Sequence, residues 1–131
     1  KSNNMENQKT ILVVEDDLAL QEAFKLTMAK EKSIRVLTAS TGEEALAVLE
    51  KELPDLVTLD ILLPKMNGID VLRNMRLNPR LKDVLVVVVS VSGDNEKMKE
   101  AFKLGIVGFL IKSDYKIDDL VKKIKGFLSL P

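Results

Sequence analysis

The stretch "DLVTLDILLPKMNGIDVL", residues 55–72, joins a short apolar run to a Pro/Asn/Gly turn and then to a second apolar pattern. Its first part, residues 55–59, has the length and composition of a buried strand. Asn67 can cap the helix that the second part predicts through about Leu77. The strand ends on Asp60, where a charge is costly unless another group pairs with it. Asp60 is therefore either a solvated cap residue or part of a site, and the rest of the chain decides between the two.

The order of one strand followed by one helix occurs five times along the chain. Continuous apolar strands that alternate with amphipathic helices predict a parallel sheet covered on both faces. Right-handed crossovers then give a doubly wound, five-stranded, three-layer α/β/α fold. The expected strands are residues 10–14, 34–38, 55–59, 84–89 and 106–111, and the expected helices are about 18–30, 41–52, 67–77, 96–104 and 117–128.

The composition limits the class of protein. The 131 residues suffice for one domain with a sizeable core, because 46% of them are hydrophobic. Lysine and arginine total 20, as do aspartate and glutamate, which argues against a general nucleic-acid binder or a polybasic membrane binder. The chain has no cysteine and no histidine, which excludes disulfides, thiolate catalysis, histidine metal sites and Ser-His-Asp triads. Reactive chemistry must come from carboxylates, lysine, hydroxyls or a hard metal ion.

Residues 1–9 are polar and are expected to be a disordered tail or a remnant of expression, with Met5 as the natural start. Residues 10–131 are the expected domain. The tail lacks the apolar core of a signal peptide, and the longest apolar runs are about strand length, too short to cross a bilayer. The expected location is therefore the cytoplasm, without membrane contact.

Residues with useful chemistry follow four of the five predicted strands. In a doubly wound sheet, ligands bind outside the carboxyl ends of the strands, so these residues converge if their strands are neighbours. They are Glu15, Asp16 and Asp17 after the first strand, Asp60 after the third, Ser90 after the fourth and Lys112 after the fifth.

Carboxylates gathered at one edge repel each other unless they bind a cation. Mg²⁺ prefers oxygen ligands and suits a site with two carboxylates and several waters. Asp16 and Asp60 would be the direct ligands, and Glu15 would act through water. Lys112 would neutralise part of the remaining charge.

The nucleophile available at such a site is a carboxylate, which can accept a phosphoryl group as an acyl phosphate. Asp60 is the best candidate because it stands alone on the central strand. Lys112 and the metal would stabilise the phosphoryl oxygens, and the Ser90 hydroxyl would donate to one of them.

Each feature also has a simpler interpretation. The acids at residues 15–17 can be solvated side chains and a helix cap, and Asp60 can cap a turn. Ser90 can begin a loop, Lys112 can be a surface residue, and Phe109 can belong to the core. The combination is more specific than its parts, because four strands in the right order each end in the required residue type.

Four motifs carry a resemblance to a known family: "ILVVEDD", "PDLVTLDILLPKMNGIDVL", "VVVVSVSG" and "GFLIKS", in this order. With them the chain resembles a response-regulator receiver domain of two-component signalling, from about Thr10 to Leu128. The resemblance implies the flavodoxin-like (βα)5 receiver fold.

Site roles implied by this resemblance can be assigned residue by residue. Asp60 resembles the phosphoacceptor, and Lys112 the phosphate-binding lysine. Ser90 matches the switch hydroxyl and Phe109 the aromatic switch residue. The acidic pair, Glu15 and Asp16, would organise Mg²⁺ (or Mn²⁺) together with the backbone carbonyl of Leu62.

The resemblance also implies partners. A sensor histidine kinase or a histidine phosphotransfer protein would supply the phosphoryl group, and a downstream target or output domain would respond. The face made by residues 96–104, 106–111 and 117–128 would exchange partners and can support a homodimer. The domain would catalyse only its own phosphotransfer and dephosphorylation, without turnover as an enzyme and without binding nucleic acid directly.

Three positions depart from the family pattern. Ser113 stands where most receivers have proline, so the Lys112–Ser113 peptide is expected to be trans. Val91 is branched where a small residue is usual, which narrows access to Asp60. Leu62 cannot orient a water by hydrogen bonding, so slow hydrolysis of the phosphoryl group is expected.

The sequence leaves three alternative functions. A flavodoxin-like nucleotide or flavin carrier needs a phosphate-binding loop after the first strand, where this chain has acids. An aspartate-based phosphohydrolase normally has a second acid two residues after the nucleophile, where Leu62 stands. A receiver-like interaction module that works without phosphorylation is the more serious alternative.

Overall fold

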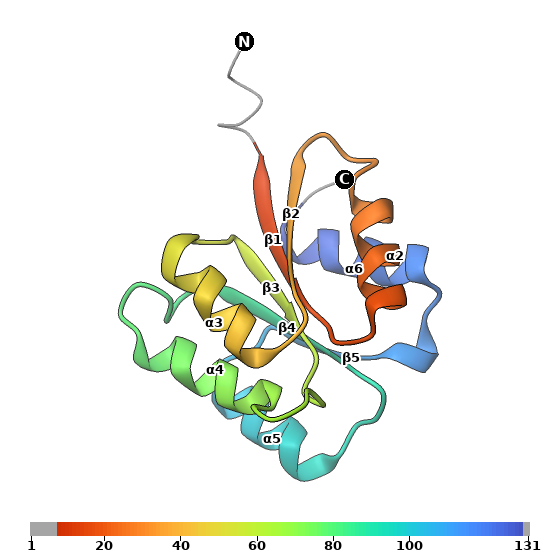
Figure 1. The fold of residues 1–131 in the computed structure, drawn as a ribbon. Coiled ribbons are helices and arrows are strands. Elements are labelled where there is room, and N and C mark those ends of the chain that lie inside the picture. Colours follow the sequence, from red (N-terminus) through yellow and green to blue (C-terminus); the bar gives the residue numbers. More distant parts are fainter. Residues whose placement is uncertain (1–7, 130–131) are drawn as a thin grey trace.

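The computed structural model describes residues 8–129, and its centre is one parallel sheet of five strands. The strands lie in the order β2-β1-β3-β4-β5 (Figure 1). This confirms the predicted doubly wound α/β fold, in which the chain starts near the middle of the sheet and winds toward each edge. The strands are β1 (Lys9–Val14), β2 (Ile34–Ala39), β3 (Leu56–Leu59), β4 (Leu85–Ser90) and β5 (Gly108–Ile111).

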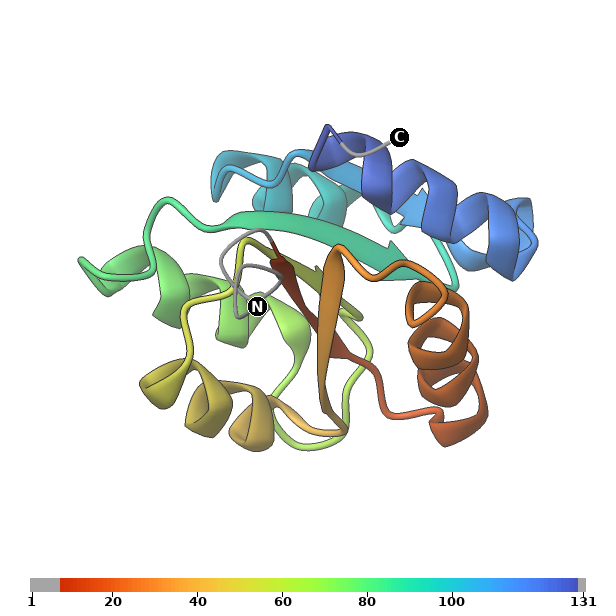
Figure 2. The same ribbon diagram turned by 90° about the horizontal axis from the view of Figure 1, so that it is seen from above.

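Helices cover both faces of the sheet, which confirms the three predicted layers. Helices α2 and α6 lie on one face, and α3, α4 and α5 lie on the other (Figures 1 and 2). Their bounds are α2 (Leu18–Met28), α3 (Gly42–Lys51), α4 (Gly68–Leu77), α5 (Asn95–Lys103) and α6 (Ile117–Phe127), with a short 3-10 helix, η1 (Lys112–Asp114), after β5.

The strands are apolar on both faces because each face packs against helices. Alternate residues of β1 therefore enter different cores: Leu12 and Val14 join the core under α3, α4 and α5, whereas Ile11 and Val13 join the core under α2 and α6. All four side chains are almost fully buried. Both cores end at the carboxyl edge of the sheet, where the polar residues begin.

Side-chain caps start the helices close to the expected residues. Asp17 accepts from the amides of Ala19 and Leu20, and Asn67 accepts from the amide of Asp70. Thr41 accepts from the amide of Glu44, as the capping-box spacing predicts. The Glu44 carboxylate in turn accepts from the amide of Ser40 at 2.7 Å. Each of these caps lies in the segment that follows a strand, so these three helices begin near the edge where the strands end.

The observed bounds differ from the expected ones by a few residues. β1 begins at Lys9 rather than Thr10, because the Lys9 amide donates to the carbonyl of Ser33 at 2.8 Å. β5 begins at Gly108 rather than residue 106. The expected disordered tail falls largely on residues 1–7, which lie outside the described residues.

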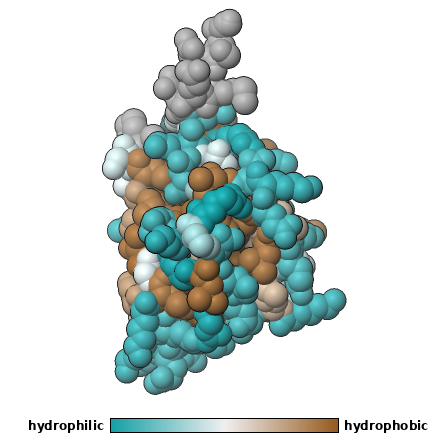
Figure 3. Space-filling view, turned by 90° about the vertical axis from the view of Figure 1, so that its left-hand side faces the viewer, coloured by the Kyte–Doolittle hydropathy of each residue, from teal (hydrophilic) through white to brown (hydrophobic). Residues whose placement is uncertain are grey.

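Within residues 8–129, none of the helices combines the length and the apolar character that crossing a bilayer requires. On the face seen in Figure 3, hydrophobic and hydrophilic side chains are interspersed across the middle, and hydrophilic ones cover the lower part.

Gly68 allows the loop after β3 to fold back against Asp60. Its amide donates to the carbonyl of Ile61 at 2.9 Å. A Cβ at this position would overlap the backbone oxygen of Asp60 and would lie 2.8 Å from Cα of Ile61. Asp60 and Ile61 are buried, and their backbone atoms cannot move aside cheaply, so the position of Asp60 depends on the absence of a side chain at residue 68.

We predict that Gly68→Ala destabilises the protein by about 1–3 kcal/mol, the usual range for overpacking. Helix propensity alone would favour alanine at the first residue of α4, so the expected destabilisation is opposite to the effect of helix propensity. Gly126→Ala is the matched control, because a Cβ there meets nothing within 4 Å. This control should stabilise α6 by up to about 1 kcal/mol. Urea unfolding measures both changes, and equal effects of the two variants would contradict the prediction.

Candidate functional site

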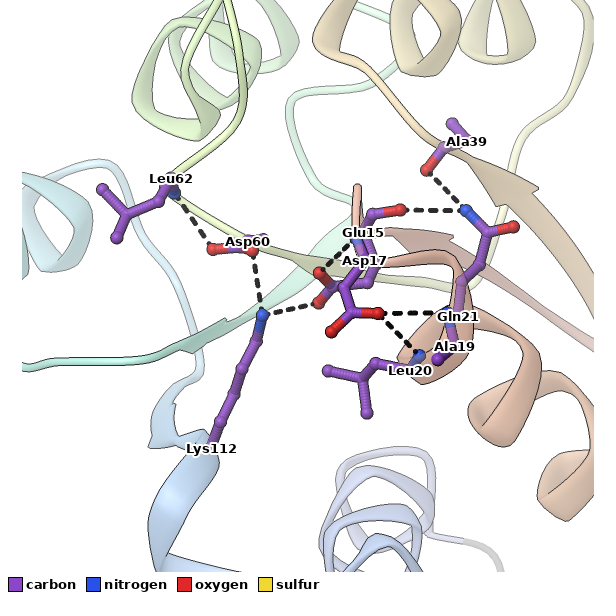
Figure 4. Close-up of polar contacts among 9 residues, drawn as sticks. All are labelled: Glu15, Asp17, Ala19, Leu20, Gln21, Ala39, Asp60, Leu62 and Lys112. Atoms are coloured by element: carbon purple, nitrogen blue, oxygen red, sulfur yellow. Dashed lines mark hydrogen bonds and ion pairs between the residues drawn. The ribbon is translucent and has the colours of Figure 1, made fainter.

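The candidate site lies at the carboxyl edge of the sheet, where β1, β3, β4 and β5 are consecutive neighbours. Glu15 and Asp60 directly follow β1 and β3, Ser90 ends β4, and Lys112 follows β5. Because all strands are parallel, these four residues come to one edge (Figure 4 shows three of them). The predicted convergence is therefore observed.

Asp60 is 3% exposed and both of its carboxylate oxygens accept hydrogen bonds. The amide of Leu62 donates to Oδ1 at 3.0 Å, and Nζ of Lys112 donates to Oδ2 at 2.9 Å. The amide of Asp60 donates to the carbonyl of Val14 at 3.1 Å, which ties it to the end of β1. Asp60 is thus a paired, buried carboxylate and not a solvated cap.

Glu15 is as buried as Asp60, with 2% of its surface exposed. Its Oε1 lies 2.8 Å from Nζ of Lys112, and its Oε2 accepts from the amide of Asp17 at 3.1 Å. Burial raises the pKa of Glu15, and this effect exceeds the opposing effects of Lys112 and the Asp17 amide; the charge of Asp60 adds to the rise. Glu15 therefore binds protons more readily than a solvated glutamate.

Lys112 places one ammonium group between the two buried carboxylates (Figure 4). Burial lowers the pKa of Lys112, but hydrogen bonds to Glu15 and Asp60 and their charges outweigh burial, so its pKa is raised. Lys112 is the first residue of η1 and directly follows β5. The peptide from Lys112 to Ser113 is trans, as expected from the missing proline.

Asp16 is exposed to solvent, unlike Glu15 and Asp60, which are buried. One carboxylate oxygen from each of Glu15, Asp16 and Asp60 lies within 4.8 Å of the others. Three acids with oxygen donors at this spacing fit a hard divalent cation such as Mg²⁺.

Ser90 and Phe109 line one small cavity beside Asp60. Its volume is about 220 Å³, and Leu62 and Lys97 also line it. Ser90 is 2% exposed, whereas Phe109 is only partly buried and packs against the core under α3, α4 and α5. Val91 is 55% exposed, and its expected effect on access to Asp60 stays a prediction.

Gln21 is a neighbour of the site that the sequence did not indicate. Its side-chain amide reaches from α2 to the backbone carbonyls of Glu15 and Ala39 (Figure 4). A glutamine in the first turns of an amphipathic helix normally indicates only an exposed face. Its acceptors are carbonyls of other segments, and no sequence pattern marks such a contact.

A family model described as "Response regulator receiver domain" matches residues 11–125. "Transcriptional regulatory protein DegU" of Brevibacillus brevis is 32% identical over 121 residues, which cover 92% of this chain and 50% of the relative. The phosphorylated cyanobacterial phytochrome response regulator RcpA has 30% identity and a TM-score of 0.81, over 92% of this chain and 91% of that one. The Mn²⁺-bound form of response regulator Rcp1 has 29% identity and a TM-score of 0.78, over 92% of each chain. This chain spans about half the length, or less, of the curated relatives it matches.

Replacing Lys112 with methionine tests the ion pairs. The variant loses the hydrogen bond and the charge that lower the pKa of Glu15, while burial and the Asp60 charge remain. The pKa of Glu15 should therefore rise further, and an NMR titration of its carboxyl carbon measures this. Lys103→Met, an exposed lysine near the opposite edge of the sheet, should leave the pKa unchanged. An unchanged or lower pKa of Glu15 in Lys112→Met would contradict the observed pairing.

The same variant has a pH-dependent stability. A carboxyl whose pKa is raised by folding stabilises the folded state below its unfolded pKa, about 4.3 for glutamate, and loses that contribution as the pH rises through the folded pKa. Metal-free Lys112→Met should lose more stability than wild type as the pH rises from about 4.3, the unfolded value, toward neutrality. Urea unfolding across this range provides the comparison.

Proposed function

Because this chain belongs to the response-regulator receiver family, we propose that Asp60 accepts a phosphoryl group from a phosphohistidine and that the change in charge controls a partner protein. The observation that supports this most is the ammonium of Lys112, which lies 2.8 Å from Glu15 and 2.9 Å from Asp60 at the carboxyl edge of the sheet. RcpA, a structural relative, was solved in its phosphorylated form.

Mg²⁺ is the proposed cofactor, with Mn²⁺ as a substitute. Asp16 and Asp60 would hold it with their carboxylates, Glu15 through water, and Leu62 with its backbone carbonyl. The three close acids support this set, and Rcp1, another relative, was solved with Mn²⁺ bound. The bound ion would supply positive charge to the phosphoryl oxygens.

The chain's own residues have separate tasks in the transfer. An oxygen of Asp60 forms the new O–P bond while the N–P bond of the donor breaks and the imidazole nitrogen keeps the electron pair. Lys112 already donates to Asp60, and its ammonium is positioned to neutralise charge on the phosphoryl group. The amide of Leu62 orients the carboxylate from the other oxygen.

Ser90 and Phe109 are the proposed switch. Their shared cavity of about 220 Å³ offers space for rearrangement beside the phosphoacceptor. Ser90 would move its hydroxyl toward the phosphoryl group, and Phe109 would turn inward to fill the space. The change would reach the face formed by α5, β5 and α6, which is the proposed surface for an output partner or a homodimer.

The proposed donor is a sensor histidine kinase or a histidine phosphotransfer protein. Response regulators act between such donors and an output, and the transcriptional regulator DegU is about twice as long as the part that this chain matches. The balanced charge of the chain supports protein partners over nucleic acid. Chemistry is limited to the phosphorylation and dephosphorylation of Asp60.

Amide NMR spectra with Mg²⁺ and beryllofluoride, which imitates a phosphoryl group, test the proposal. We expect wild type to shift at Asp60, Ser90 and Phe109, and Asp60→Asn to show no beryllofluoride response. Asp70→Asn is the control, because this aspartate lies outside the acidic cluster, in the first turn of α4. It should respond as wild type does.

A wild type that Mg²⁺ and beryllofluoride leave unchanged would overturn the proposal. The interaction module that works without phosphorylation would then be the better hypothesis. Shifts confined to Asp60, without any at Ser90 or Phe109, would keep the phosphoacceptor and reject the switch.

The lifetime of the phosphoryl group depends on residue 62. Leu62 is 46% exposed and lines the cavity beside Asp60, but its side chain cannot hold a water by hydrogen bonding. We predict slow hydrolysis in wild type and a several-fold shorter half-life in Leu62→Asn, because an amide can position the attacking water. Phosphate release from protein phosphorylated by a small donor measures both. A half-life of wild type of only seconds would contradict the prediction.

A further inference from the structure

The side-chain amide of Gln21 joins two segments beside the acidic cluster. Its Nε2 donates to the carbonyl of Glu15 at 2.9 Å, to Oγ of Ser40 at 3.1 Å and to the carbonyl of Ala39 at 3.3 Å. Figure 4 shows this amide between the backbones of Glu15 and Ala39. One half-buried side chain from α2 thus ties the end of β1 to the end of β2.

The surroundings define which end of the amide faces these groups. Two of the three neighbouring atoms are carbonyl oxygens, which accept and never donate. The NH₂ group must therefore point at them, and its two hydrogens serve three acceptors. A side chain of the same shape that cannot donate would place an oxygen or a methyl group against two carbonyls.

Glu15 is the residue that this contact holds. Its amide donates to the carbonyl of Ala39 at 3.0 Å, and its own carbonyl accepts from Gln21. Both polar groups of its backbone are thus engaged, while its carboxylate accepts from Lys112 and from the amide of Asp17. The carbonyl bound by Gln21 belongs to the peptide that joins Glu15 to Asp16. The direction of both acids depends on this peptide.

We propose that Gln21 is a positioning residue for the acidic cluster: by holding the peptide between Glu15 and Asp16, it keeps their carboxylates directed toward Asp60 and thereby sets the affinity for Mg²⁺. This inference rests on the proposed function, because it assigns Gln21 to the same metal site. Mutation of residues that orient metal ligands without touching the metal commonly weakens metal binding by large factors.

The substitution Gln21→Glu distinguishes a positioning role from a purely electrostatic effect by the direction in which the affinity for Mg²⁺ changes. It keeps the shape of the side chain but adds a negative charge near the acids, and Coulomb attraction alone would tighten cation binding. A carboxylate cannot donate to the carbonyls of Glu15 and Ala39, so the positioning role predicts weaker binding. The two explanations therefore predict opposite changes in affinity.

Gln8→Glu is the matched control. Gln8 makes the same kind of contact, with Nε2 donating to the carbonyl of Lys32 at 3.2 Å. It precedes β1 and so lies at the opposite edge of the sheet from the acids. The control changes the same atoms and the same charge, and removes one side-chain hydrogen bond to a carbonyl of another segment.

Isothermal titration of the full chain with MgCl₂ at neutral pH is the test, at a temperature where circular dichroism shows each variant to be folded. We expect Gln21→Glu to bind Mg²⁺ about tenfold more weakly than wild type, and Gln8→Glu to bind as wild type does. Gln21→Met, which removes the donor without adding charge, should also weaken binding and serves if Gln21→Glu does not fold. In metal-free protein, the amide signals of Glu15 and Asp16 should shift in both Gln21 variants.

Binding of Mg²⁺ by Gln21→Glu that is as tight as in wild type, or tighter, would overturn the inference and leave the proposed function standing. The same holds if the Gln21 variants lose only thermal stability while their affinity is unchanged, since the contact would then be purely structural. A wild type that binds no Mg²⁺ in this titration would instead overturn the proposed metal site, and the inference with it.

Discussion

One ammonium group between two buried carboxylates is the interaction on which the site depends. Glu15 and Asp60 are 2% and 3% exposed, and two such charges would be strongly unfavourable without a cation between them. Lys112 supplies that cation from the residue that follows β5, and β4 lies between β5 and β3 in the sheet. The pairing therefore joins the ends of three strands, and the charge of the acids is coupled to the position of the loop after β5.

A site balanced by one lysine is suited to respond to added charge. In the proposed mechanism, a phosphoryl group on Asp60 brings negative charge to a place where Lys112 is already shared, and the neighbouring cavity lined by Ser90 and Phe109 provides room to rearrange. A local electrostatic change then biases a packed element that has two arrangements. In this mechanism the buried strands beneath the site would stay in place, because both faces of the sheet are covered.

Uncharged residues give the acids their geometry. Gly68 lets the loop after β3 close against the backbone of Asp60, and Gln21 holds the backbone of Glu15 from the side of α2. The amide of Leu62 orients one oxygen of Asp60. Each of these contacts involves a backbone atom, so the orientation of the carboxylates depends on the chain path as well as on the charges.

The sequence by itself determined the architecture and the members of the site. The hydrophobic period and the composition of a segment are local properties. They were sufficient to predict a doubly wound sheet and its reactive edge, from the apolar runs, the caps at Asp17, Thr41 and Asn67, and the position of each acid after its strand. Only the tertiary structure decided how those members pair. That Lys112 bridges Glu15 and Asp60, and that Gln21 donates to carbonyls of two other segments, depends on distances between residues far apart in the chain, which no local pattern encodes.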